Sequence, residues 1–263
     1  MKILTCIKQV PASSNVDVDP ETGVLIRDGK NVKMNPYDLY ALETAYLLKA
    51  RSGAHVHTVT MGPPSAADVL REALMMGSDG ATLLSDPRFA GADVLATAYA
   101  LSQMLRRIGF DLIICGKQTT DGDTAQVGPE IAEFLDVPHV SYVRDVDLRD
   151  DKTLRIRTVD DRHEDVLDIK LPCLITVDKD ANTPRLPSFK RKRSTRDIRI
   201  ETWTLDDLSD KEATHYGLRG SPTQVESIFP PERQATGRIH SNLENPGKTL
   251  FDILVEQKWL RGD

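Results

Sequence analysis

Short apolar runs alternate with helix-period segments through the first half of the chain. The runs have the length and the β-branched content of strands, and they cover residues 2–7, 56–61, 81–85 and 112–115. Between them, apolar residues recur at helical spacing after Asn35-Pro36, after Ser65 and after Asp93. This rhythm predicts an α/β fold with a doubly wound, mostly parallel sheet and helices on both faces. Such sheets bind ligands beyond the carboxyl ends of their strands.

The second half predicts a different arrangement. Residues 140–148, 154–159 and 166–177 form further β runs joined by short polar turns, which predicts an antiparallel extension of the sheet. We therefore expect an α/β domain over residues 1–196. Residues 197–263 contain few apolar side chains, so we expect an extended C-terminal arm that packs on a partner subunit and includes an amphipathic helix over residues 248–260.

Composition excludes several classes of protein. The 34 Lys and Arg against 40 Asp and Glu give a net charge of −6, which argues against a chain that coats nucleic acid. No apolar run is long enough for a membrane span. Cys6, Cys115 and Cys173 each lie inside an apolar run, so we expect three buried thiols, no metal site and a reducing, cytoplasmic location.

The most unusual segment is CGKQTTDGDTAQVGP, residues 115–129. It follows an apolar strand and precedes a helical pattern, with Asp123 or Thr124 as the expected helix cap. The free backbone N–H groups of a first helical turn would hold a phosphate or pyrophosphate, although a plain capped helix start is the alternative. It is neither a P-loop nor the usual dinucleotide fingerprint. The candidate binding residues are Gly116, Asp121, Gly122, Asp123, Thr124, Ala125, Gln126, Val127 and Gly128.

Other candidates come from neighbouring strand ends. Asn35 and Asp38 open a helix and form a second candidate segment, and an ordinary helix start is the alternative. Met61, at a strand end, would line the same crevice, and a tight strand-to-helix turn is the alternative. No nucleophile–base arrangement stands out, so no side chain is assigned a catalytic role.

A basic segment follows the last β run. Arg185, Phe189 and Lys190 belong to it, and an exposed aromatic side chain among prolines and cations is a candidate anchor for a protein partner. A solvated loop and a nucleic-acid contact are the alternatives, and the second is disfavoured by the overall negative charge.

Five segments together resemble one known family. They are KQVP at residues 8–11, Asn35-Pro36, Met61-Gly62-Pro63, REALMMG at residues 71–77 and GKQTTDGDTAQVGP, and they resemble the β subunit of electron-transfer flavoproteins. The resemblance implies a heterodimer with an FAD-carrying α subunit. It implies a nucleotide crevice at Cys6, at residues 35–38, at Met61 and at residues 116–128. It also implies a recognition loop at residues 182–192 that docks on an acyl-CoA dehydrogenase, with Phe189 where other members have leucine.

The resemblance extends to one branch of that family. Residues 121–127, DGDTAQV, resemble the electron-bifurcating branch, in which the β subunit binds a second FAD. This implies hydride transfer from NADH to that FAD and electron transfer to ferredoxin and, through the α-subunit FAD, to an acyl-CoA or related dehydrogenase. A non-bifurcating carrier with structural AMP and an unrelated adenine-nucleotide-binding enzyme or sensor are the alternatives.

Overall fold

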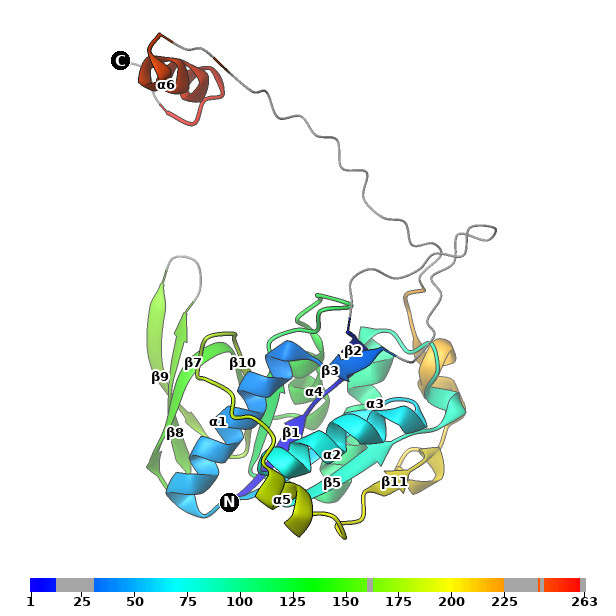
Figure 1. Ribbon diagram of the computed structural model, residues 1–263. Coiled ribbons are helices and arrows are strands. Elements are labelled where there is room, and N and C mark those ends of the chain that lie inside the picture. Colours follow the sequence, from blue (N-terminus) through cyan, green and yellow to red (C-terminus); the bar gives the residue numbers. More distant parts are fainter. Residues whose placement is uncertain (13–30, 160–162, 225–240, 242–243, 261–263) are drawn as a thin grey trace. The chain divides into compact units, whose positions relative to one another are not determined.

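The computed structural model describes residues 1–12, 31–159, 163–224, 241 and 244–260. The chain divides into two compact units, Met1–Glu226 and Ser227–Asp263. The first unit contains a large sheet with helices packed on it (Figure 1). In the second unit the structure describes one helix, α6 (Pro246–Glu256).

Nine strands form the main sheet, in the order β11-β5-β4-β1-β6-β10-β7-β8-β9. Their bounds are β1 (Lys2–Cys6), β4 (His55–Met61), β5 (Gly80–Leu84), β6 (Leu112–Gly116), β7 (His139–Asp150), β8 (Thr153–Val159), β9 (Glu164–Lys170), β10 (Cys173–Val177) and β11 (Glu201–Trp203). A separate antiparallel pair, β2 (Gln9–Pro11) and β3 (Val32–Met34), follows β1 and precedes the first helix.

The order of the strands reverses between β1 and β6. From β1 the chain moves outward through β4 and β5, and it then returns to place β6 on the other side of β1, with all of these pairs parallel. In the register of β1 and β6, Cys6 lies beside Cys115. A crevice forms at such a reversal because the connections on its two sides leave in opposite directions, and ligands of open α/β sheets bind there.

Helices cover both faces of this sheet, which confirms the predicted doubly wound α/β fold (Figure 1). Side chains of successive strand residues alternate between faces. In β1, Ile3 packs in the core under α1 (Pro36–Ser52) and α2 (Ala67–Met76), whereas Leu4 packs in the core under α3 (Val94–Ile108) and α4 (Val127–Leu135).

The β run predicted over residues 166–177 is two strands. β9 ends at Lys170 and β10 begins at Cys173, because Leu171-Pro172 interrupts the ladder where Pro172 has no N–H to donate. β9 pairs antiparallel with β8, and β8 with β7, so the antiparallel extension is present. β10 instead lies between β6 and β7, parallel to both.

The predicted boundary at residue 196 falls inside the first unit. β11 pairs with β5 at the sheet edge, and Leu205, Leu208 and Tyr216 are buried in the core under α3. The described residues 197–224 therefore lie in the first unit. Few apolar residues suffice here because they pack on a core that already exists.

The second unit begins at Ser227. Residues 225–240, 242–243 and 261–263 of the predicted arm lie outside the described residues. α6 starts at Pro246, two residues before the predicted start, since the Asn245 side chain accepts the N–H of Lys248 at 3.1 Å. Among the described residues, no helix has both the length and the apolar character needed to cross a membrane.

Candidate functional site

A cavity of about 390 Å³ opens at the strand-order reversal. It lies at the carboxyl ends of β1 and β6, where the sequence predicted a binding crevice. Ten of the predicted binding residues line it: Cys6, Asp38, Met61, Gly116, Gly122, Thr124, Ala125, Gln126, Val127 and Gly128. Asn35, Asp121 and Asp123 do not line it, although each belongs to a segment beside it.

The loop between β6 and α4 is longer than the sequence predicted. We expected Asp123 or Thr124 to cap the helix, but α4 begins at Val127 with Gln126 as the cap residue and no side-chain cap hydrogen bond. Asp123 instead accepts a hydrogen bond from Gln118 Nε2 at 2.9 Å, within the loop. The loop residues therefore stay outside the helix, and their backbone faces the cavity.

The backbone of this loop has the geometry of an anion site. Asp123 and Ala125 are left-handed, with φ of 51° and 55°, whereas Gln126 is right-handed, with φ of −103° and ψ of −28°. Alternating left- and right-handed residues turn successive N–H groups toward one point, which makes a concave site for an anion. For residues other than glycine such conformations cost about 1–3 kcal/mol each, and they cluster at functional sites.

The first amides of α4 remain available. In the described part of the chain, the N–H groups of Gln126, Val127 and Gly128 have no protein acceptor, and the helical hydrogen bonds begin with Glu130 N–H to Gln126 C=O at 3.0 Å. These amides lie at the positive end of the helix dipole. The junction can therefore hold a phosphate or diphosphate by its main chain.

Two glycines let the main chain approach closely. A Cβ on Gly128 would lie 2.5 Å from Thr176 Cγ2, so glycine lets the start of α4 sit directly over β10. A Cβ on Gly116 would overlap the Asp38 carboxylate and lie 2.8 Å from the carbonyl carbon of Tyr37, so glycine lets the end of β6 meet the start of α1. Both positions shape the cavity floor.

Asn35 positions the loop. Its side chain is fully buried, its Nδ2 donates to the Gln118 carbonyl at 2.8 Å, and its Oδ1 accepts the N–H of Thr120 at 3.3 Å. Both polar atoms are therefore used by the segment after β6. Asn35 also stands at the start of α1, as predicted, but its side chain does not cap that helix.

An ion pair fastens the same loop to the end of β1. Lys8 Nζ donates to both carboxylate oxygens of Asp121, at 2.9 and 2.7 Å. Burial alone would raise the pKa of Asp121, but the hydrogen bond and charge of Lys8 hold it below its usual range. Asp121 thus closes the loop and faces Lys8 rather than the cavity.

Asp38 is the buried acid of the cavity wall. Burial raises its pKa to about 7, against the opposing effect of hydrogen bonds such as the one from the Lys8 backbone N–H, at 2.7 Å. Near neutral pH this carboxyl is therefore partly protonated. A neutral acid repels an anionic ligand less than a carboxylate would.

Cys6, a predicted wall residue, lines the cavity, and so does Cys115, which was predicted only as a buried thiol. All three cysteines are buried and free, as expected. Hydrogen bonding with Cys6 and burial raise the pKa of Cys115 well above its usual value. The Cys115 thiol therefore stays protonated, and it forms a small part of the wall beside Cys6. In the described part of the chain no three His, Cys, Asp or Glu side chains group as metal ligands would.

The sequence analysis missed one wall of the cavity. The connection from β5 to α3 supplies Phe89, Gly91, Ala92 and Asp93, and α3 itself supplies Val94, Thr97 and Leu101. Two lysines, Lys8 and Lys117, also line the cavity. The sequence did indicate this wall, because the segment after the predicted strand at residues 81–85 must also start at the carboxyl edge of the sheet. How far α3 leans over the crevice depends on packing and is not visible in the pattern.

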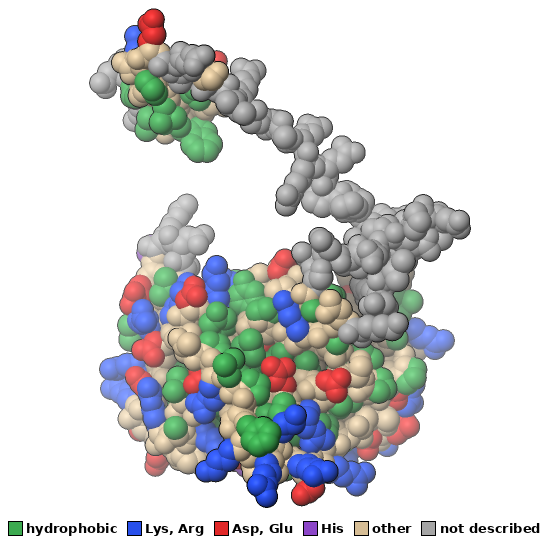
Figure 2. All heavy atoms as spheres, viewed as in Figure 1, with side chains coloured by type: hydrophobic (Ala, Val, Ile, Leu, Met, Phe, Trp, Pro, Cys, Tyr) green, Lys and Arg blue, Asp and Glu red, His purple; other side chains and the backbone are tan. Residues whose placement is uncertain are grey.

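The predicted docking residues lie apart from the cavity, on the loop that leads into α5 (Phe189–Ser194). Phe189 and the neighbouring Leu186 are each 85% exposed. Lys190 is also exposed. Figure 2 shows hydrophobic side chains among Lys and Arg where α5 lies. Leu186 was not predicted, although it stands between Arg185 and a proline in the same segment.

Arg185 has an internal role. Its guanidinium binds Glu43 of α1 at 2.7 and 2.8 Å and lies 5.0 Å from the centroid of the Tyr46 ring. Arg191 similarly donates to the carbonyls of Leu74 and Ser78, at 3.1 and 2.7 Å. These contacts fix the base of the loop and leave its apolar side chains outward.

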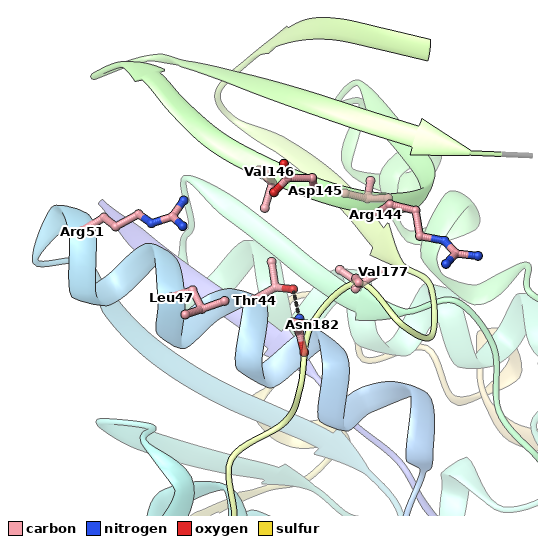
Figure 3. Close-up of a pocket in the computed structure, with 10 residues that line it drawn as sticks. Thr44, Leu47, Arg51, Arg144, Asp145, Val146, Val177 and Asn182 are labelled. Carbon is pink, nitrogen blue, oxygen red and sulfur yellow. Dashed lines mark hydrogen bonds between the residues drawn. The ribbon is translucent and has the colours of Figure 1, made fainter. Parts of the chain in front are cut away.

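A second, smaller cavity of about 40 Å³ lies between α1 and β7 (Figure 3). Asn182 Nδ2 donates to Thr44 Oγ1 at 2.9 Å in it, and Asn182 Oδ1 is buried with no partner among the described residues. A cavity of this size has room for ordered water and not for a nucleotide.

Comparison with known proteins agrees with this geometry. The chain matches the electron transfer flavoprotein domain family over residues 22–208. It is 43% identical over 257 residues to the electron transfer flavoprotein subunit beta of Clostridium acetobutylicum, with 98% of this chain and 97% of that protein covered. It is 41% identical over 273 residues to protein FixA of Bradyrhizobium diazoefficiens, with 100% and 94% covered.

A third relative belongs to a named enzyme complex. This is the caffeyl-CoA reductase-Etf complex subunit CarD of Acetobacterium woodii, 42% identical over 242 residues, with 91% of each chain covered. These relatives match nearly the whole chain. The family match over residues 22–208 includes the loop between β6 and α4 and the helix starts beside the cavity, whereas β1 precedes it. The chain therefore belongs to the electron transfer flavoprotein family and is one of its β subunits, which pair with an α subunit in electron transfer.

Proposed function

We propose that the cavity of this β subunit binds FAD and that the heterodimer bifurcates electrons. Bound FAD would accept a hydride from NADH and supply single electrons to ferredoxin and, through the α-subunit FAD, to an acyl-CoA or related dehydrogenase. The observation that carries the proposal is the group of amides at Gln126, Val127 and Gly128, beside the strand-order reversal, which have no acceptor among the residues that the structure describes.

The residues present fit such a ligand. A volume of about 390 Å³ lies within the roughly 300–1,000 Å³ of ligand pockets. The two loop carboxylates, Asp121 and Asp123, are held by Lys8 and Gln118 and do not line the cavity. Of the two acids that do, Asp38 keeps its proton to about pH 7 and Asp93 is occupied as the α3 cap. A diphosphate at the start of α4 would therefore meet main-chain donors, and Asp93 is the lining acid whose pKa, against the effect of burial, is held below its usual value by its hydrogen bonds.

Gly122 supports FAD over AMP. A Cβ at this position would meet only Thr119 Oγ1, at 3.5 Å, so the cavity beside it is open. The segment Asp121-Gly122-Asp123 places no side chain there, whereas a third carboxylate would add bulk and negative charge. This leaves room for the second phosphate of FAD and for the riboflavin part attached to it.

The exposed Leu186 and Phe189 support docking on a dehydrogenase. Apolar side chains on a loop whose base is fixed by Arg185 and Arg191 can enter an apolar pocket with little loss of conformational entropy. The cations of α5 favour a pocket with an acidic rim. CarD, named as a subunit of a complex with a caffeyl-CoA reductase, makes an acyl-CoA-type partner the favoured one.

Flavin counting in the purified α/β heterodimer tests this function. We expect two FAD per heterodimer and oxidation of NADH when a low-potential acceptor is supplied. One FAD and one AMP would instead establish the structural-AMP carrier. Isolation of the chain as a self-associating protein with ATP turnover would establish an unrelated nucleotide-binding protein.

A matched pair of variants places the ligand. Gly122→Asp adds a carboxylate in open space, and we expect FAD retention by the β subunit to fall at least ten-fold, since like charges about 4 Å apart repel by about 1–4 kcal/mol. Gly122→Asn adds nearly the same volume without the charge and is expected to keep most of the FAD. Equal FAD content in both variants would argue against this placement.

A further inference from the structure

Lys117 is a cation of the cavity with free donors. Its side chain is 28% exposed, and its Nζ donates no hydrogen bond to any residue that the structure describes. The ammonium of the other lining lysine, Lys8, donates hydrogen bonds to the Asp121 carboxylate. Lys117 therefore has N–H groups available to a ligand, whereas Lys8 is occupied.

The nearest acid does not neutralise Lys117. Asp178 Oδ1 lies 3.4 Å from Lys117 Nζ, while its Oδ2 lies 3.2 Å from Arg144 Nη2. One buried carboxylate thus serves two cations, and one positive charge remains. Arg144 Nε is also buried with no acceptor among the described residues. A half-buried excess of positive charge favours an additional anion.

Lys117 faces the side of the sheet on which α4 starts. Side chains alternate along a strand, so Lys117 and Cys115 point to the same side. The position of a Cβ on Gly128, in the first turn of α4, is 3.7 Å from Cys115 Cβ. The Lys117 N–H continues the ladder by donating to the Val177 carbonyl at 2.8 Å. The lysine therefore lies on the side of the sheet on which α4 begins, and it lines the same cavity as the free amides of α4.

A bulge in β7 brings an aromatic ring to the lysine. The register of β7 and β10 shifts between Ile175 and Val177, and Tyr142 at this point is left-handed, with φ of 60°. Lys117 Nζ lies 4.6 Å from the centroid of the Tyr142 ring. A strained conformation of a bulky residue persists where its surroundings fix it, and here it holds an ammonium in place.

We propose that Lys117 binds a phosphate oxygen of the nucleotide in this cavity, and that Asp178 and Tyr142 hold its ammonium in position. The inference rests on the proposed nucleotide-binding function. It applies to both FAD and AMP, because each carries a phosphate next to adenosine. Lys117 would then supply a side-chain charge to a site that otherwise binds through its main chain.

Titration of the nucleotide-free α/β heterodimer with adenosine, AMP and ADP tests the proposal by calorimetry. For Lys117→Gln we expect the affinity for AMP and ADP to fall about 10- to 100-fold, as for the loss of one charge-assisted hydrogen bond, and the affinity for adenosine to stay the same. Lys117→Arg keeps the charge and is expected to retain most of the AMP affinity. Lys152→Gln, in the exposed turn between β7 and β8, is the charge-matched control.

Tyr142 provides a second variant in case Lys117→Gln lowers stability. Tyr142→Leu keeps the lysine but removes the ring and is expected to weaken AMP binding, whereas Tyr142→Phe keeps the ring and the affinity. Unchanged AMP affinity in Lys117→Gln would overturn the proposal, and so would an equal loss for adenosine, which would show a purely structural role. A wild-type heterodimer that binds no adenine nucleotide would overturn the proposed function itself, before any variant is made.

Discussion

Asp38 makes the stability of the chain depend on pH in an unusual direction. Burial raises its pKa from 3.8 to about 7. Between these two values the folded chain holds a proton that the unfolded chain has lost, so stability falls as pH rises. The free energy of unfolding therefore falls by at most about 4 kcal/mol over this range, because the pKa differs by 7 − 3.8 units and one unit is about 1.4 kcal/mol.

Asp38→Asn isolates this effect, because an amide does not titrate here. We expect the free energy of unfolding of the wild type, relative to the variant, to decrease from pH 4 to pH 7 and then to level off. Urea denaturation at closely spaced pH values measures it. Parallel pH profiles for the two proteins would show that the carboxyl is already ionised when folded.

Residue types alone gave the cavity wall but not the orientation of each side chain. Cys6, Met61, Gly122 and residues 124–128 line the cavity, because strand ends and glycine-rich turns have few alternatives, and their contact with a nucleotide stays a prediction. Asn35 was placed on the ligand, yet it binds the carbonyl of Gln118. Whether the Asn35 side chain faces a ligand or the loop depends on Gln118, 83 residues away along the chain, and a contact over that distance cannot be predicted from local sequence.

For helix α4, the sequence predicted the existence of the helix but not its first residue. The sequence predicted a helix after the loop, and its apolar face packs as expected, with Ile131 and Ala132 buried. Its start was predicted too early, since Asp123 and Thr124 are good caps in general. The start is set instead by the left-handed Ala125 and by the contact of Gly128 with β10.

Gly128→Ala is expected to destabilise the junction of α4 and β10. The added methyl would lie 2.5 Å from Thr176 Cγ2, and overpacking of this kind costs about 1–3 kcal/mol. Thr176→Ser removes that methyl but keeps the hydroxyl that accepts the Tyr142 N–H, so the double variant should regain part of the loss. Thermal unfolding of the two single variants and the double variant measures the coupling. Additive effects would show that the two groups do not meet.

For the whole molecule, strand order matters more than any single motif. Parallel strands end at the same edge of the sheet. This brings together segments that are distant in sequence, near residues 6, 38, 61, 92 and 116–128. The alternation of strands and helices therefore predicted the location of the cavity. It could not predict that β10 would insert between β6 and β7, because a strand after a hairpin can join the sheet at several places.

Helix α6 of the second unit has an apolar face that is exposed in the isolated chain. No residue of α6 is buried, and its apolar side chains include Leu250 and Phe251, 59% and 49% exposed. We infer that this face packs on the α subunit. Burying a Leu or Phe side chain contributes about 1.5–3 kcal/mol, so the double variant Leu250→Ser/Phe251→Ser should weaken the heterodimer by about 100-fold or more.

Sedimentation equilibrium of the α/β mixture measures that loss, and Lys248→Gln, on the same helix but without an apolar change, is the control. The unfolding midpoint of the isolated β chain is expected to stay the same in the double variant, because the buried cores lie in Met1–Glu226. A lower midpoint would mean that the helix stabilises its own chain. An unchanged heterodimer affinity would mean that its apolar face serves another partner.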